Sequence, residues 1–217
     1  ALDNLAKETQ RAALRIEPVA TTGDEIYDIL RTRIFEKLPD FEVRDSVATK
    51  YAEAVRDAKQ MDLTTQSPDS FAMELRQSYP FHFSLRDLYG RFKANPGFQQ
   101  TRGLLRMMRA VVANLWSSGL AKSLYLIHPY NIDLNDADIF SEFLNINQSL
   151  SEAIRIDIAN NGTSHAEELD KTLARPGPGT KPEGLAQDAA KLIYVASLAN
   201  NPGAVLGLHD TEIIAWL

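Results

Sequence analysis

The sequence predicts a mainly α-helical protein. Apolar residues recur three and four positions apart along most of the 217 residues, which is the spacing that lines one face of a helix. Proline, glycine and asparagine interrupt this pattern at turns, most clearly at residues 95–97 and 175–184. Few segments have the composition of a strand. We therefore expect a bundle of helices with little β structure.

The expected helices begin and end at identifiable signals. Thr22, with Glu25 three residues later, predicts a capping box at the start of the helix that ends near Leu38. Pro68 suits the first turn of another helix, which should end before Tyr79-Pro80. The apolar periodicity predicts helices over residues 7–16, 22–38, 43–60, 67–78, 84–93, 99–117, 135–144, 148–159, 164–174, 185–199 and 209–217.

Two places are candidates for short strand pairs. Residues 123–127, SLYLI, form a short apolar run that ends at His128-Pro129, and a second pair is expected around residues 204–208. Near the end of the chain, two expected helices flank a tight turn at residues 200–203. This order predicts a small helix-turn-helix or winged-helix-like unit at the C-terminus.

Length and composition restrict the class of protein. A chain of 217 residues forms one large domain or two small ones. Its 23 basic and 29 acidic residues give a net charge of -6, so the molecule as a whole is not a general binder of nucleic acid. The absence of cysteine excludes disulfides and cysteine metal sites, and a cytoplasmic location is the simplest expectation. We see no signal peptide and no run of about 18 apolar residues, so no membrane role is expected.

No complete catalytic motif is found in the sequence. It lacks the phosphate loop GxxxxGK[ST], GxGxxG, HExxH and GxSxG. His82 and His128 stand at segment junctions, where a structural role is expected. His165 lies near Glu167, Glu168 and Asp170, but on a helix these side chains point in different directions. We therefore expect no metal site.

The expected helix over residues 99–117 has an apolar face and a basic one. Arg102, Arg106 and Arg109 fall within roughly 60° of each other on a helical wheel. The apolar face predicted to pack in the core comprises Leu104, Leu105, Met107, Met108, Val111, Val112, Leu115 and Trp116. The arginines are either an ordinary solvated surface or a surface that meets phosphate, whose oxygens suit the planar guanidinium. Gly103 would allow a ligand to approach the first turn closely.

Residues 78–116 resemble a known protein family. SYPFHFSLRDLYGRF followed by FQQTRGLLRMMRAVVANLW is similar to a signature of the domain-of-unknown-function 499 family. Its members are large prokaryotic ATPases of the AAA-plus type, often encoded with phage-defence or DNA-modification genes. The segments 24–36, 126–134 and 189–217 extend the resemblance over nearly the whole chain. Phe83 stands where the family usually has proline.

The resemblance implies that this chain is the C-terminal part of such an ATPase, with the phosphate loop located N-terminal to it. Residues 1–120 would be the end of the ATPase core and its helical lid. Residues 121–217 would be a helical extension, with a winged-helix-like unit as one form that it could take. Arg102 would be the lid arginine called sensor 2, with Gly103 and Arg106 also near the nucleotide. Arg31 or Arg33 would serve near a neighbouring subunit or form a structural salt bridge.

The implied function is to couple ATP binding and hydrolysis by the full-length protein to action on DNA or on a partner, such as a defence-system protein. ATP and Mg would bind the full-length protein, which could be an oligomer, and no cofactor is expected on this chain alone. The alternative is a non-enzymatic helical module that binds DNA or protein. The basic residues that would then contact nucleic acid are Arg86, Arg91, Lys93 and Arg109, and the net charge of -6 weighs against this alternative.

Overall fold

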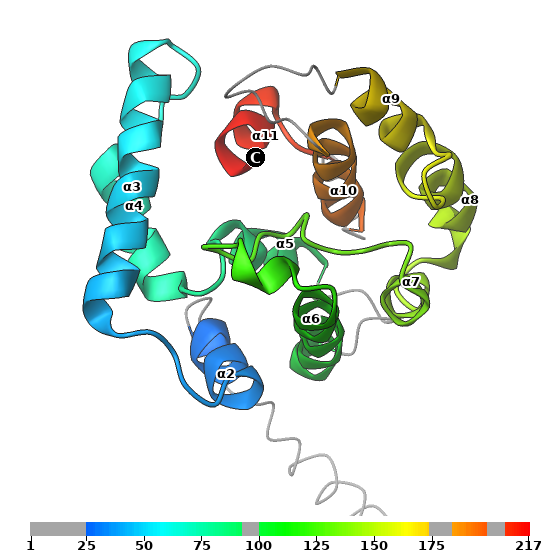
Figure 1. The fold of residues 1–217 in the computed structure, drawn as a ribbon, viewed down its shortest axis with the longest axis horizontal. Helices are drawn as coiled ribbons and strands as arrows, with labels where there is room; N and C mark the ends of the chain where they lie inside the picture. The colour runs from blue at the N-terminus through cyan, green and yellow to red at the C-terminus, as the bar shows by residue number, and fades with distance from the viewer. Residues whose placement is uncertain (1–24, 93–99, 174–183, 199–206) are drawn as a thin grey trace, which may run out of the picture.

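The computed structural model describes residues 25–92, 100–173, 184–198 and 207–217, and within them the chain is mainly helical, as predicted (Figure 1). In chain order the elements are α2 (Glu25–Ile34), α3 (Phe41–Gln60), α4 (Pro68–Ser78), α5 (Ser84–Phe92), α6 (Gln100–Ser117), the 3-10 helix η2 (Leu120–Lys122), α7 (Ala137–Leu144), the 3-10 helix η3 (Gln148–Leu150), α8 (Ser151–Ala153), the π-helix η4 (Ile154–Ile158), α9 (His165–Leu173), α10 (Leu185–Ser197) and α11 (Asp210–Trp216). The predicted helix 7–16, the cap residue Thr22 and the turn 200–203 lie outside the described residues.

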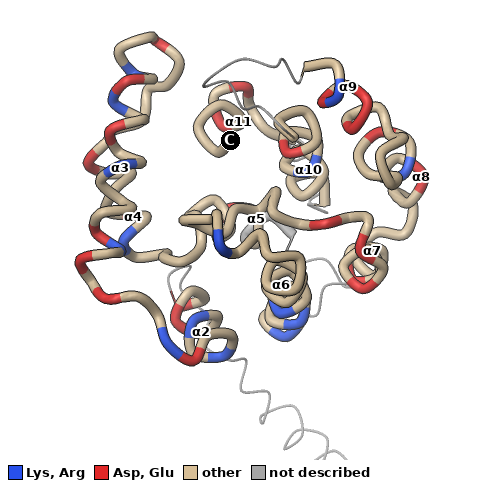
Figure 2. The backbone as a smooth tube through the Cα atoms, in the orientation of Figure 1, with Lys and Arg blue, Asp and Glu red and all other residues tan. Residues whose placement is uncertain are grey.

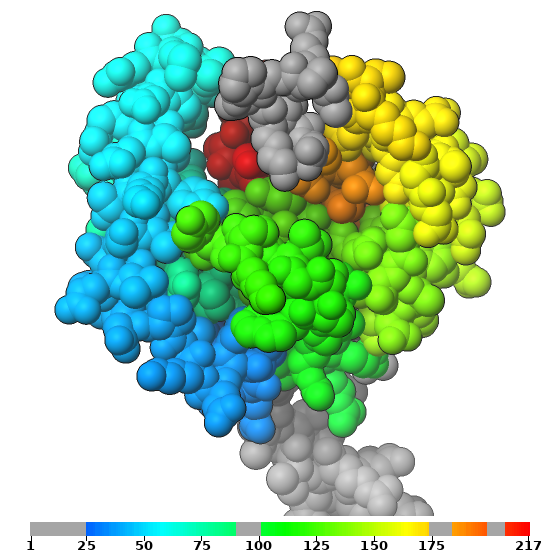
Figure 3. All heavy atoms as spheres, in the orientation of Figure 1, coloured from blue at the N-terminus to red at the C-terminus, as the bar shows by residue number. Residues whose placement is uncertain are grey.

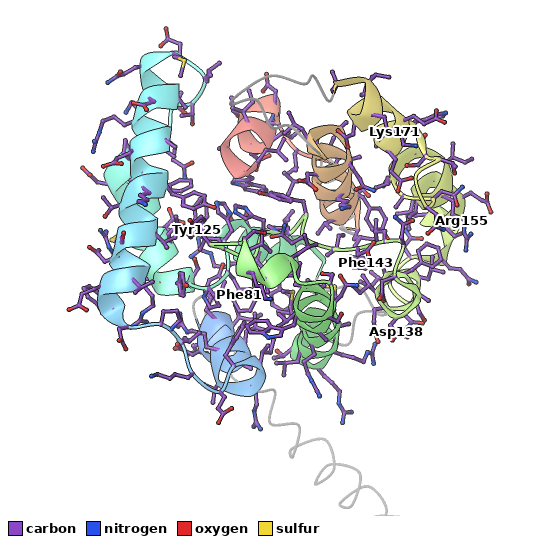
Figure 4. All side chains as sticks on the ribbon, viewed as in Figure 1. Phe81, Tyr125, Asp138, Phe143, Arg155 and Lys171 are labelled. Carbon is purple, nitrogen blue, oxygen red and sulfur yellow. The ribbon has the colours of Figure 1, made fainter. Side chains whose placement is uncertain are left out.

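A large hydrophobic core joins α2, α5, α6, α7, α10 and α11. Leu30, Leu88, Leu104 and Phe143 are among its fully buried members, and Trp216 of α11 closes it near the end of the chain. Figure 4 shows Phe143 directed from α7 toward α10, where its ring lies 5.6 Å from that of Tyr194. This core takes residues from both sides of position 120, so the predicted division at residue 120 is not marked by a break in packing.

A second core holds α3 and α4 together along one side of the molecule (Figure 1). Val47, Ala52, Phe71 and Leu75 pack between the two helices. The hydroxyl of Tyr27, a residue of the large core, donates to the carbonyl oxygen of Phe83 in the second core at 2.7 Å. The two cores are therefore joined at the start of α5.

The predicted strand at residues 123–127 is not formed. Ile127 makes a single parallel bridge with Phe81, in which its amide donates to Pro80 O at 2.8 Å and its carbonyl accepts from His82 N at 2.9 Å. The pairing cannot extend, because α5 begins at Ser84 and draws the partner segment into a helix. Residues 204–206 of the second expected strand pair lie outside the described residues.

The predicted helix over residues 148–159 is divided into three short pieces. The 3-10 helix η3, a single α turn and the π-helix η4 follow one another without a gap. Asn147 caps the first piece by accepting from the Ser149 amide at 3.1 Å. The change in helix type still directs Ile154 and Ile158 into the core. No described helix has the length and apolar character needed to cross a membrane.

Candidate functional site

Helix α6 packs one face into the core and leaves the other exposed. Leu104, Met107, Met108, Val111 and Leu115 are buried, as the periodicity predicts. Trp116 was expected in this set and is instead 68% exposed. The error has a simple geometric cause: Trp116 follows Arg109 by seven residues and Arg102 by fourteen, so it lies close to the basic stripe on the helical wheel.

The exposed face of α6 forms a groove with the end of α2 and the residues that follow it. The groove has a volume of about 1100 Å³, and Figure 2 shows the basic residues of α2 and α6 at the same end of the molecule. Five cationic side chains line it: Arg33, Lys37, Arg102, Arg106 and Arg109. Glu36 is the acidic residue in the lining. We call this surface the basic groove.

The cations of the basic groove differ in their bonding. Arg106 Nε donates to Glu142 Oε2 of α7 at 2.6 Å, so this charge is paired. Arg102 and Arg109 are exposed and make no hydrogen bond or ion pair within the described part of the chain. Arg102 occupies the first turn of α6, where the helix dipole also favours an anion. The neighbouring Gly103 is buried.

The two arginines predicted near a subunit boundary have different environments. Arg33 lines the basic groove. Arg31 instead donates to the carbonyl oxygens of Gln77 at 2.6 Å and Tyr79 at 3.1 Å, and it pairs with Asp28. Arg31 therefore fastens α2 to the end of α4 by hydrogen bonds, and its salt bridge with Asp28 lies within α2.

Of the predicted nucleic-acid patch, the structure describes the side chains of Arg86 and Arg109. Arg86 is partly buried and forms ion pairs with Glu74 at 3.0 Å and Asp87 at 3.3 Å. Only Arg109 of this set lines the basic groove. Lys93 and the side chain of Arg91 lie outside the described residues. Sequence reasoning missed Lys37 and Glu142, because neither belongs to the periodic stripe on α6 and only the fold brings them to it.

The predicted structural histidines lie in a stack of rings. His82 and His128 are buried with ring centroids 4.7 Å apart, and Tyr130 stacks on the other side of His128 at 4.7 Å. His82 Nδ1 accepts from the Ser84 amide at 3.2 Å, at the start of α5. Burial lowers the pKa of His128 to about 4, although the backbone of Trp216 acts in the opposite direction. Burial and the neighbouring His128 lower the pKa of His82 well below its usual value. Both rings are neutral near pH 7, which suits packing.

His165 and Glu167 take part in other contacts. His165 pairs with Asp157 at 2.9 Å, whereas Glu167 Oε2 accepts from the amides of Asn160, Gly162 and Ser164 at 2.9 to 3.1 Å. Burial alone would raise the pKa of Glu167, but its hydrogen bonds, including one from Asn135, outweigh burial and hold the pKa at about 2. Glu167 is therefore the reciprocal partner of Ser164 in a capping box at the start of α9. The described residues contain no group of three or more side chains suited to a metal ion.

Lys191 of α10 is a further buried charge. It is 9% exposed, and its ammonium lies 3.7 Å from Asp188 Oδ1. Burial lowers the pKa of Lys191, although Asp188, Asp133 and Glu167 act in the opposite direction. Burial likewise raises the pKa of Asp188 to about 6, with Lys191 opposing and Asp170 adding to the shift. The pair is an internal ion pair of α10.

The fold and the groove together define a helical domain that presents a row of cations along one rigid helix. The scan against protein families matches residues 21–205 to the model described as DUF499 second domain. The chain belongs to the DUF499 family, and the resemblance predicted from its motifs is confirmed. A search of curated proteins and a search of solved structures each found no match.

Proposed function

We propose that this domain is the helical lid and C-terminal module of a AAA-plus ATPase, and that Arg102 contacts the terminal phosphate of ATP held by another part of the complete protein. The observation that carries the proposal is the environment of the Arg102 side chain. It lies in the first turn of a packed helix, it is exposed, and it makes no ion pair within the described part of the chain. An exposed guanidinium without a partner is available to an anion that the domain does not itself supply.

The mechanism is electrostatic. Because five leucine, methionine and valine side chains fix α6 in the core, the helix backbone that carries Arg102 moves with the whole lid. Contact between Arg102 and the transferring phosphoryl group stabilises negative charge and links the position of the lid to the state of the nucleotide. In this scheme ATP and Mg bind mainly outside the domain, and the domain alone does not hydrolyse ATP.

The test is Arg102→Ala in the complete protein, with ATP affinity and phosphate release measured separately. Turnover is expected to fall on the order of a hundredfold, as when one preorganised donor is removed from an active site. Arg106→Ala should have a smaller effect, since Glu142 already pairs with Arg106. Arg56→Ala, an exposed arginine of α3, is the matched control. Unchanged affinity and turnover in Arg102→Ala would remove the proposal.

A DNA-binding role for the C-terminal unit has less support. The described α11 carries Asp210 and Glu212 in its first turn and no lysine or arginine. A recognition helix enters the major groove between negatively charged phosphates, which would repel these carboxylates. Twelve residues, 198–209, separate α10 from α11, more than the three or four of the usual helix-turn-helix. A winged-helix unit remains a prediction from the sequence.

A further inference from the structure

An apolar pocket adjoins the basic groove at the C-terminal end of α6. It has a volume of about 440 Å³, and its walls are mainly aliphatic: Leu38, Pro39, Pro80, Leu115, Leu124 and Ile127 all contribute. Phe35 forms one side and is held in place by Phe81, with ring centroids 5.9 Å apart. The pocket is therefore a formed cavity with a fixed wall, of a size that holds one or two apolar side chains.

Two large aromatic side chains border this pocket and remain open to solvent. Trp116 and Tyr125 are each 68% exposed. Figure 4 shows Tyr125 between α3 and the centre of the molecule, and Tyr125 also borders a shallow apolar depression along α3 with Val43 and Val47. Exposed tryptophan and tyrosine beside an apolar pocket are the residues most enriched at the centres of protein interfaces.

The pocket and the basic groove form one continuous surface. Phe35, Lys37, Val112 and Trp116 line both. Arg109 and Arg33 in the groove therefore lie near the mouth of the apolar pocket, with Lys37 at the junction. Arg109 is two turns of α6 from Arg102, about 10 Å along the helix axis, so this end of the groove is separate from the position proposed for the phosphate.

The chemistry of this combined surface selects its ligand. An aliphatic cavity recognises an aliphatic or aromatic side chain, while the neighbouring cations recognise carboxylates. Single-stranded nucleic acid would need aromatic faces placed along a cationic track, and here the cavity walls are mostly leucine, isoleucine and proline. The overall charge of -6 also disfavours a polyanion over a short acidic segment.

We propose that this surface binds an acidic segment of a partner protein, which inserts a leucine or phenylalanine side chain into the apolar pocket and places flanking carboxylates against Lys37, Arg33 and Arg109. Trp116 covers the inserted side chain. The inference does not require that Arg102 contact a nucleotide, and it concerns the opposite end of α6.

The experiment uses the full 217-residue chain and a fluorescein-labelled peptide with a central Leu-Phe pair between aspartates, followed by fluorescence anisotropy at low and high salt. The peptide should bind, and replacing the Leu-Phe pair by alanines should weaken binding about tenfold or more. Trp116→Ala and Lys37→Glu should each weaken it by a similar factor. Both side chains are exposed, so circular dichroism should show an intact fold.

Matched control variants distinguish binding at this surface from general effects of charge and hydrophobicity. Lys59→Glu on α3 makes the same charge change away from the groove, and Ile156→Ala removes an exposed apolar side chain on η4. Neither should alter binding. The proposal is overturned if the peptide fails to bind at low salt, if the alanine peptide binds equally well, or if Trp116→Ala has no effect. It is also overturned if an oligothymidylate strand, and not the peptide, binds in a manner that depends on Trp116. None of these measurements involves ATP, so failure here leaves the test of Arg102 intact.

Discussion

Tyr27→Phe should destabilise the protein through the loss of one hydroxyl group. Tyr27 is 1% exposed and its hydroxyl donates to Phe83 O at 2.7 Å and accepts from Arg86 N at 3.1 Å. These bonds join α2 to the first turn of α5 and link the two cores. The phenylalanine ring fits the same space, so the change removes the hydrogen bonds and leaves the packing in place.

The expected loss of unfolding free energy depends on the two backbone groups that lose the Tyr27 hydroxyl as a partner. Losing a buried hydrogen bond costs about 1 kcal/mol, and an unsatisfied buried partner adds about 1 to 3 kcal/mol. The addition is small here, because Arg86 N also donates to Phe83 O at 3.0 Å and each group keeps that partner. We expect a decrease of about 1 to 2 kcal/mol in the free energy of unfolding. With a urea m-value of about 2 to 3 kcal/mol/M, the midpoint should fall by roughly 0.5 M.

Equilibrium urea denaturation followed by circular dichroism measures this change. Tyr125→Phe is the control, since the Tyr125 side chain is exposed and the midpoint should stay within error. If Tyr27→Phe shifts the midpoint no more than Tyr125→Phe does, the hydroxyl does not join the two cores.

Three further substitutions test the core and the buried charges. Phe143→Ala empties a fully buried site and should cost about 3 to 5 kcal/mol in urea denaturation, and a cost below 1 kcal/mol would mean that α7 is not packed as described. Glu167→Gln should cost about 1 to 2 kcal/mol at pH 7. Because the folded-state pKa of Glu167 is lowered from 4.5 to about 2, its stabilisation is present above pH 4.5 and is lost as the pH falls through 2. The difference between the variant and the parent in denaturation curves should therefore shrink steadily as the pH is lowered from 4.5 toward 2. The folded-state pKa of Asp188 is raised from 3.8 to about 6, so the contribution of this carboxyl to stability is present below pH 3.8 and is lost as the pH rises through 6. The parent protein should therefore lose about 2 kcal/mol of unfolding free energy between about pH 4 and 6.5. Asp188→Asn should not show this loss when stability is measured over the same pH range.

The sequence predicts most helices of this fold because their signals are local. Pro68 opens α4 and Ser84 opens α5 where expected, and the apolar stripe of α6 is buried except at Trp116. The prediction of a strand at residues 123–127 was wrong because a strand needs a partner segment. The segment at Phe81 makes one bridge, with Ile127, and then continues into α5. Ser164 and Glu167 also have the spacing of a capping box in the sequence, and in the structure each accepts a hydrogen bond from the backbone amide of the other.

The candidate site was only partly predictable for the same reason. The spacing of Arg102, Arg106 and Arg109 gives a basic stripe from the sequence alone. That Arg33 and Lys37 face this stripe depends on the angle at which α2 crosses α6, which the sequence pattern does not contain. Arg31 and Arg33 are equivalent in the sequence motif, yet the carbonyl oxygens of Gln77 and Tyr79 bind one and not the other.

The basic groove cannot be explained by what it contributes to the stability of the fold. The chain has more acidic than basic residues, yet one acidic residue, Glu36, stands among five cations in the lining. Like charges three and four residues apart on a helix repel one another, and the ion pair of Arg106 with Glu142 is exposed enough to offset only a small part of that cost. The opposite face of α6 already holds the helix in the core, so the arginines are not needed for folding. A cluster that costs stability, and in which Glu36 and Glu142 balance only part of the positive charge of five cations, is best explained by an external anion. We propose that this anion is a phosphate at the Arg102 end and a partner's carboxylates at the Arg109 end.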